Sequence, residues 1–279
     1  MKKISRRSFL AAAGLSVAAL ALTACGGSSA STASSVASSA ASSEAASTSA
    51  AAGELTTVEA GKLTMATNAA FPPYEMTTDA GEFEGIDIET AQAIADKLGL
   101  ELQIDDMDFD AALLSVQQGK ADIVMAGVTV TDERKAVMDF SDSYATGIQS
   151  IIVPEGSDIA SPDDLAGKMI GTQRGTTGYI YCSDDFGDDA VVAYDNGLTA
   201  VQALNNGQVD AVVIDNAPAK EFVAANPGLV ILDTSYAEED YAIGMAKGSA
   251  LEDAINKALE ELKEDGTLQS IVDKYINAN

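Results

Sequence analysis

Residues 111–127 read AALLSVQQGKADIVMAG, and residues 199–215 read TAVQALNNGQVDAVVID. At a constant offset of 88 positions, four residue types coincide in the two stretches: Ala112 with Ala200, Gly119 with Gly207, Asp122 with Asp210, and Val124 with Val212. Each stretch has the pattern of a helix, a glycine-containing turn, an acidic residue and a buried strand. We interpret this echo as one unit that occurs in each half of the chain, which predicts two similar lobes. The weak self-similarity of any βαβ chain is the alternative.

Outside these stretches, the chain alternates short apolar runs with amphipathic helical patterns. Strands are expected at residues 63–67, 100–104, 123–127, 169–172, 191–194, 211–215, 230–232 and 241–246. Helices are expected at residues 88–98, 110–118, 198–206, 217–225, 251–264 and 268–276. This alternation predicts an α/β fold with mostly parallel sheets covered by helices on both faces. Because ligands bind beyond the carboxyl ends of strands in such sheets, Gly127 and Asp215 are expected to face one cleft.

The first 25 residues have the pattern of an export signal. Four basic residues within the first seven positions precede residues 9–24, an apolar segment without acidic residues. That segment is too short and too rich in alanine for a firm transmembrane span. The run SRRSFL at residues 5–10 is compatible with twin-arginine export, and an ordinary Sec signal with two adjacent arginines is the alternative.

The signal ends in LTACG at residues 22–26, which resembles the lipobox of bacterial lipoproteins. Cys25 is therefore the predicted lipid-attachment residue, and two acyl chains there would give stable membrane anchoring. A chance cysteine behind a cleaved signal is the alternative. Residues 26–53 are almost entirely Ser, Ala, Thr and Gly, so we expect a disordered tether between anchor and fold.

Charge and composition exclude several classes of function. Without the signal, 12 basic residues face 43 acidic ones, a net charge of −31, which argues against nucleic acid and against adhesion to anionic lipid. The chain has no histidine, and Cys182 is the only cysteine after Cys25. A disulfide within the folded part, a zinc site and a Cys/His nucleophile are therefore not expected. We expect no cofactor and no enzymatic activity.

Two charged residues are candidates for holding the two ends of a zwitterion. Arg134 is one of two arginines after the signal and follows Gly127 and Thr129, where an expected strand ends. Its guanidinium suits bidentate binding of a carboxylate, although a surface ion pair with a neighbouring acid is the alternative. Asp215 ends the corresponding strand of the other half and can accept hydrogen bonds from an ammonium group. Its alternative role is that of N-cap for the following helix.

Aromatic and glycine-rich segments complete the candidate site. Phe71, in the proline-stiffened run FPPYE, and Phe109 are candidate walls for a ligand, with ordinary core packing as the alternative. Residues 171–178 read GTQRGTTG and lead into a helical pattern, so exposed N–H groups there are expected to form an anion nest. The lysine of a phosphate-binding P-loop is absent from this run.

Taken together, three runs resemble the polar amino-acid substrate-binding proteins of ABC importers, the extracellular solute-binding family 3. These runs are residues 127–142, FPPYE at 71–75 and GTTG at 175–178, and the resemblance extends over about residues 55–279. It implies a two-lobed fold of the type II periplasmic-binding-protein kind that closes on its ligand about a hinge of two segments.

The same resemblance implies the division of the chain. Lobe 1 would comprise residues 56–142 together with residues 242–279, and lobe 2 would comprise residues 147–237. The hinge would lie near residues 143–146 and 238–241, where the chain crosses between the lobes.

Roles for single residues follow from the resemblance as well. Arg134, Thr129 and Gly127 would hold the α-carboxylate with the backbone of Thr177, and Asp215 would hold the α-ammonium. The ligand-binding set implied is Asn68, Phe71, Phe109, Ala126, Gly127, Thr129, Arg134, Gln173, Thr177 and Asp215. Several family members that bind cationic or amide side chains carry an acid at the position of Asn68, so the neutral amide disfavours a lysine- or histidine-like ligand. It leaves uncharged polar amino acids, arginine and cystine open.

The implied partners are a free amino acid and the membrane subunits of an ABC importer. The protein would be a monomer on the outer face of the cytoplasmic membrane, held there through its lipid alone. A lipoprotein that presents its ligand to a separate sensor, and a dehydratase-like enzyme on the same fold, are the competing interpretations.

Overall fold

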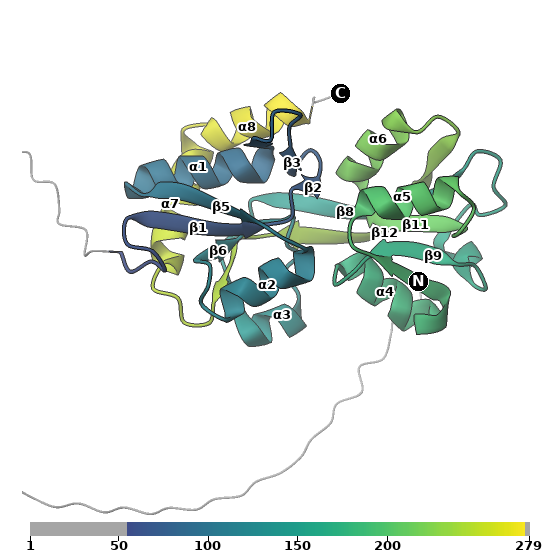
Figure 1. The fold of residues 1–279 in the computed structure, drawn as a ribbon, viewed down its shortest axis with the longest axis horizontal. Helices are drawn as coiled ribbons and strands as arrows, with labels where there is room; N and C mark the ends of the chain where they lie inside the picture. Colours follow the sequence, from purple (N-terminus) through teal and green to yellow (C-terminus); the bar gives the residue numbers. More distant parts are fainter. Residues whose placement is uncertain (1–54, 277–279) are drawn as a thin grey trace, which may run out of the picture. The chain divides into compact units, whose positions relative to one another are not determined.

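The computed structural model describes residues 55–276. The predicted signal, Cys25 and the predicted tether lie outside these residues. Within residues 55–276, no helix is both long and apolar enough to cross a membrane. The described chain contains two five-stranded sheets, each covered by helices, and a small antiparallel sheet of three short strands (Figure 1).

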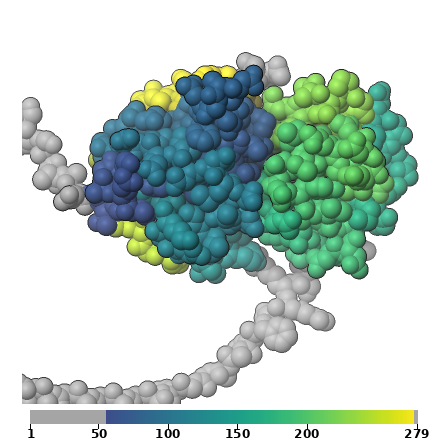
Figure 2. Space-filling model, viewed as in Figure 1, coloured from purple at the N-terminus to yellow at the C-terminus, as the bar shows by residue number. Residues whose placement is uncertain are grey.

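The first sheet has the strand order β5-β1-β6-β13-β7. Its strands are β1 (Lys62–Thr67), β5 (Glu101–Asp106), β6 (Ile123–Val124), β7 (Met138–Phe140) and β13 (Gly244–Ala246). Strand β1 is parallel to β5 and β6, whereas β13 is antiparallel to β6 and β7. Its helices are α1 (Ile86–Leu98), α2 (Phe109–Gln117), α3 (Asp132–Val137), α7 (Glu252–Glu264) and α8 (Thr267–Tyr275). The two ends of the described chain thus build one lobe, and Figure 2 shows yellow C-terminal residues beside blue and purple N-terminal ones.

The second sheet has the strand order β10-β9-β11-β8-β12. Its strands are β8 (Ala145–Pro154), β9 (Ile170–Gln173), β10 (Val191–Tyr194), β11 (Ala211–Asp215) and β12 (Leu229–Tyr241). Helices α5 (Gly197–Asn205) and α6 (Asn216–Ala225) cover one face and α4 (Thr177–Phe186) the other, as Figure 1 shows. Two 3-10 turns, η1 (Pro162–Leu165) and η2 (Asp188–Ala190), lie in its connections.

Both sheets are mixed, which corrects the expectation of mostly parallel sheets. The parallel pairs are those around β1 and β9, and the antiparallel pairs involve β13 in the first sheet and β8 in the second. Strand β8 leaves the first lobe and β12 returns to it, so the two segments run in opposite directions. Their pairing extends to Tyr241 opposite Ala145 and Asp240 opposite Thr146, which places the two expected hinge segments side by side.

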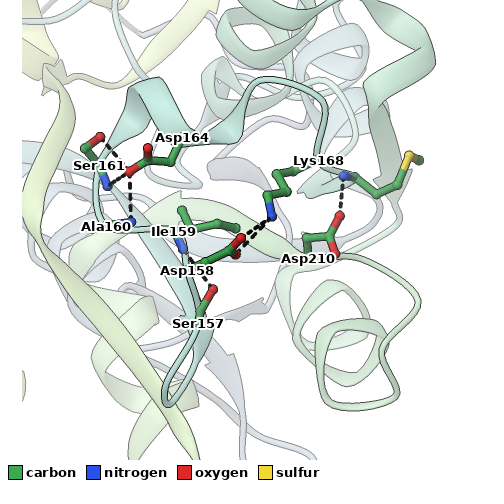
Figure 3. Close-up of polar contacts among 9 residues, drawn as sticks. Ser157, Asp158, Ile159, Ala160, Ser161, Asp164, Lys168 and Asp210 are labelled. Atoms are coloured by element: carbon green, nitrogen blue, oxygen red, sulfur yellow. Dashed lines mark hydrogen bonds and ion pairs between the residues drawn. The ribbon is translucent and has the colours of Figure 1, made fainter.

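The echo between the two halves has a structural cause. Gly119 and Gly207, which follow α2 and α5, share a left-handed φ of 66°. Three residues after each glycine, an aspartate accepts a backbone N–H at the parallel strand beside its own, from within β1 in the first lobe and from the residue before β9 in the second. Asp122 accepts from Thr64 at 2.8 Å, and Asp210 accepts from Met169 at 2.7 Å. Figure 3 shows Asp210 beside the Lys168–Asp158 ion pair on the surface of the second lobe. The repeated unit is therefore a helix, a turn and a strand, and the aspartate before the strand binds the backbone at the parallel strand beside it.

The small sheet lies between β1 and α1 in the chain. It consists of β2 (Ala70–Phe71), β3 (Glu75–Thr77) and β4 (Phe83–Glu84). Local contacts define several helix ends in the described chain. Gly99 ends α1 in the left-handed conformation, Thr131 accepts a hydrogen bond from the Arg134 N–H at the start of α3, and Ser161 forms a capping box with Asp164 (Figure 3).

Candidate functional site

One cavity is lined from both sheets at the carboxyl ends of their strands. All ten residues expected to bind ligand line it: Asn68, Phe71, Phe109, Ala126, Gly127, Thr129, Arg134, Gln173, Thr177 and Asp215. Six further residues line it that the sequence did not single out: Glu75, Gln149, Thr176, Val213, Ile214 and Tyr241. Residues far apart in the chain thus converge on one site.

The two lobes touch directly around this cavity. The Gln173 side-chain amide donates to the Asn68 carbonyl oxygen at 2.8 Å, which joins β9 to the end of β1. Arg134 Nη2 donates to the backbone oxygen of Gly175 at 3.1 Å. These contacts surround the site with polar groups from both sides.

Arg134 is held in place by the backbone and by an aromatic ring. Its Nη1 donates to the backbone oxygen of Thr129 at 2.8 Å, and its guanidinium carbon lies 5.3 Å from the centroid of the Phe109 ring. The side chain is buried, and desolvation lowers its pKa. Among residues 55–276, no carboxylate lies within 4.0 Å of it. The surface ion pair considered from the sequence is therefore not what the structure has, and a buried cation without a carboxylate suits an anionic ligand.

The structure shows Asp215 in the N-cap role considered for it and also places the residue at the cavity. Its Oδ1 accepts from the Ala217 N–H at 3.0 Å, so it caps helix α6. Its Oδ2 accepts from the Ile148 N–H at 2.7 Å, and the residue still lines the cavity. Burial raises the pKa of this carboxyl to about 6. At neutral pH it is mainly a buried carboxylate, and it faces the cavity from the lobe opposite Arg134.

Aromatic rings build one wall, and a glycine makes room for them. The rings of Phe71 and Tyr74 stack at 5.8 Å, and Tyr74 meets Tyr241 edge-on at 5.4 Å. Gly127 has a φ of 54°, and a Cβ there would come within 2.9 Å of the Phe71 ring and 3.2 Å of the Tyr241 ring. Glycine is therefore required at this position for both its backbone conformation and its packing.

Glu239, on β12, was not found from the sequence. Its Oε2 accepts from the hydroxyls of Thr129 and Thr177 and from the Gln149 amide, each at 3.0 Å. Glu239 is therefore an acceptor for both hydroxyls, which also lie 3.4 Å from each other. In a chain with 43 acidic residues, nothing marks Glu239 as buried before the fold brings Thr129 to it.

Two more carboxyl groups lie fully buried at the edge of the site. Glu75 lines the cavity, and Asp87 in α1 accepts the Gly127 N–H at 2.9 Å. Burial raises the pKa of Glu75 well above its usual value and that of Asp87 to about 6. No group of three or more metal-ligating side chains occurs in the described part of the chain.

The fold and the cavity define a two-lobed α/β binding protein of the periplasmic-binding-protein type. The family model of bacterial extracellular solute-binding proteins, family 3, matches residues 63–278. The chain belongs to this family. The proteins it matches are solute-binding proteins and not enzymes, as the sequence predicted.

Individual relatives cover nearly all of the folded chain. A probable histidine-binding protein of Neisseria gonorrhoeae is 34% identical over 273 residues, which are 95% of this chain and 94% of the relative. Among solved structures, an ancestral arginine-binding protein bound to arginine has a TM-score of 0.74 and 43% identity, and the match covers 78% of this chain and 99% of that one. An ancestral arginine-binding protein bound to glutamine is equally similar, with the same TM-score and identity over 77% and 98% of the two chains.

Proposed function

We propose that this protein binds a free amino acid in the cavity between its lobes and delivers it to an ABC importer. The observation that carries the proposal is the pair of opposite charges that the two lobes bring to one buried site. Arg134 faces the cavity from the first lobe and Asp215 from the second. A zwitterion presents a carboxylate to one and an ammonium to the other.

The carboxylate end has the better-defined site. A guanidinium has five N–H groups, and Arg134 gives two of them to backbone oxygens, so three remain for a ligand. Thr177 is the first residue of α4, so its N–H has no acceptor within the helix and suits an anion. The Thr129 and Thr177 hydroxyls point to Glu239, which favours N–H groups over hydroxyls as the donors to the carboxylate.

The charge balance favours a cationic amino acid of the arginine type. Arg134 is the one cation among the residues that line the cavity, whereas Asp215 and Glu75 line it as acids and Glu239 adjoins it. A buried carboxylate requires a counter-charge, and a ligand with a cationic side chain would provide one for Glu75. The Asn68 and Gln173 amides offer further hydrogen bonds to the side chain. The relatives named for histidine and arginine are consistent with this ligand class.

The route to the membrane is proposed from the sequence and the family. We infer that Cys25 carries the lipid, that residues 26–53 form a tether, and that strands β8 and β12 act as the hinge. Cys25→Ser should move the protein from the membrane fraction to the periplasm or medium. Membrane fractionation that is unchanged by this substitution, with normal export, would contradict the anchor.

A thermal-shift screen against the common amino acids, followed by calorimetry, tests the function. A ligand that binds only the folded state raises the melting temperature with its concentration. We expect L-arginine to give the largest increase, with L-glutamine and L-histidine weaker and L-glutamate inactive. If no amino acid stabilised the protein, the proposed function would be wrong. If only neutral amino acids did, the binding function would stand and the arginine-type specificity would fall.

A further inference from the structure

Glu75 and Asp87 form a pair of carboxyl groups with no access to solvent. Glu75 begins β3 and Asp87 is the second residue of α1, and both are 0% exposed. Neither takes part in an ion pair within residues 55–276. Both oxygens of Glu75, and Oδ1 of Asp87, have no hydrogen-bond donor. Unpaired buried carboxylates are too costly to persist in a fold, so the charge state of this pair needs an explanation.

The surroundings supply no cation to neutralise the pair. The ionisable side chains that face it are Tyr74, Asp106, Tyr144 and Asp215. The Tyr144 hydroxyl is also buried and has no hydrogen-bond partner among the described residues. Tyrosines are neutral at pH 7, and the two aspartates add negative charge. The only compensation available without a ligand is therefore a proton.

One proton satisfies the geometry. The two side chains start from neighbouring backbone positions, because the Asp87 N–H donates to the backbone oxygen of Tyr74, the residue before Glu75, at 2.8 Å. As two carboxylates they cannot bond, because both groups only accept, but one protonated group donates to the other. Asp87 also accepts the Gly127 N–H, which stabilises its charged form. Glu75 lacks such a donor, and burial raises its pKa well above the usual value, so the proton belongs on Glu75.

We propose that Glu75 and Asp87 share one proton when no ligand is bound, and that a cationic side chain in the cavity displaces it. The O–H bond of Glu75 breaks, the proton passes to the buffer, and the carboxylate pairs with the ligand cation. A neutral amino acid leaves the proton in place, because an uncharged side chain gives the Glu75 carboxylate no counter-charge, and Glu75 then offers such a ligand only an acceptor oxygen. Glu75 is thus a specificity-determining residue, and binding of a cationic amino acid is coupled to proton release. This inference rests on the proposed function.

Calorimetry in buffers of different ionisation enthalpy measures the coupling. L-Arginine and L-glutamine are titrated into the wild-type chain at pH 7 in phosphate and in Tris. We expect about one proton released per arginine bound and none per glutamine, because a nearby cation lowers the pKa of a carboxyl by about one to three units. Glu75→Gln should abolish the release and weaken arginine about tenfold or more, while glutamine binding is kept.

Glu239→Gln is the matched control, because it removes another buried acid beside the same cavity. The number of protons released per bound arginine should stay as in wild type, whatever happens to the affinity. Arginine binding with a buffer-independent enthalpy, or undiminished release in Glu75→Gln, would overturn the inference and leave the proposed function intact. If neither arginine nor any other cationic amino acid bound the wild-type chain, the inference would fall together with the arginine-type specificity.

Discussion

Replacing Arg134 is the most direct perturbation of the proposed carboxylate site. Arg134 is 8% exposed, and its guanidinium donates to two backbone oxygens, at 2.8 Å and 3.1 Å, which leaves its remaining N–H groups for the ligand. Removing one partner of a buried charge pair costs about 2–5 kcal/mol. At about 1.4 kcal/mol per tenfold change, the Kd for L-arginine should rise roughly thirty-fold to several-thousand-fold in Arg134→Ala. Arg134→Lys should recover little, because an ammonium cannot reproduce the planar fork.

Calorimetry with two ligands separates this effect from a general loss of structure. Wild-type protein should bind L-arginine amide far more weakly than L-arginine, and Arg134→Ala should lose little further affinity for the amide. Arg174→Ala is the matched control, because that side chain is 52% exposed and its ion pair with Asp195 spans 3.7 Å. It should leave the Kd nearly unchanged. Two results would refute the proposed carboxylate site: an L-arginine affinity in Arg134→Ala within a few-fold of wild type, or an equal loss of affinity for L-arginine amide in that variant.

Three further outcomes are expected from the packing and the backbone contacts. In Gly147→Ala, a Cβ would lie 2.5 Å from the Tyr241 ring, so the melting temperature should fall, with a cost of about 1–3 kcal/mol in denaturant unfolding; an unchanged stability would contradict the crowding at the crossing strands. Asp122→Ala should lower the free energy of unfolding by about 1–3 kcal/mol, and Asp210→Ala by less than about 1 kcal/mol. The reason is that Asp122 is buried and accepts two backbone N–H groups, whereas Asp210 is exposed. Equal losses in denaturant unfolding would refute this account. Native Cys182 should resist iodoacetamide, since it is fully buried and its pKa is raised to about 12, and rapid labelling monitored by mass spectrometry would show otherwise.

Local patterns in the sequence identified many of the elements but not all of their ends, since the strand expected at residues 123–127 ends at Val124 and the one expected at residues 230–232 extends over Leu229–Tyr241. The glycines after the helices take left-handed φ values, Thr131 caps α3, and the two echoing stretches fold into matching units. Each of these features depends on residues within a few positions of one another, so hydrophobic periodicity and capping preferences identify it. In open α/β sheets, ligands bind beyond the carboxyl ends of the strands. This general rule predicted that Gly127 and Asp215 would face one cleft, and both residues line the same cavity.

Contacts between distant parts of the chain were decided only by the tertiary structure. Strand β8 was not among the expected strands. The sheets are mixed because the direction of a strand depends on where the chain crosses between the lobes and not on residue type. Thr129 and Glu239 are 110 positions apart, and Glu75 meets Asp87 only after β3 packs on α1. In a chain with 43 acidic residues, the sequence alone does not distinguish the buried carboxyl groups from the exposed ones. Their burial, which raises the pKa values of Glu75, Asp87 and Asp215, exists only once the chain has folded.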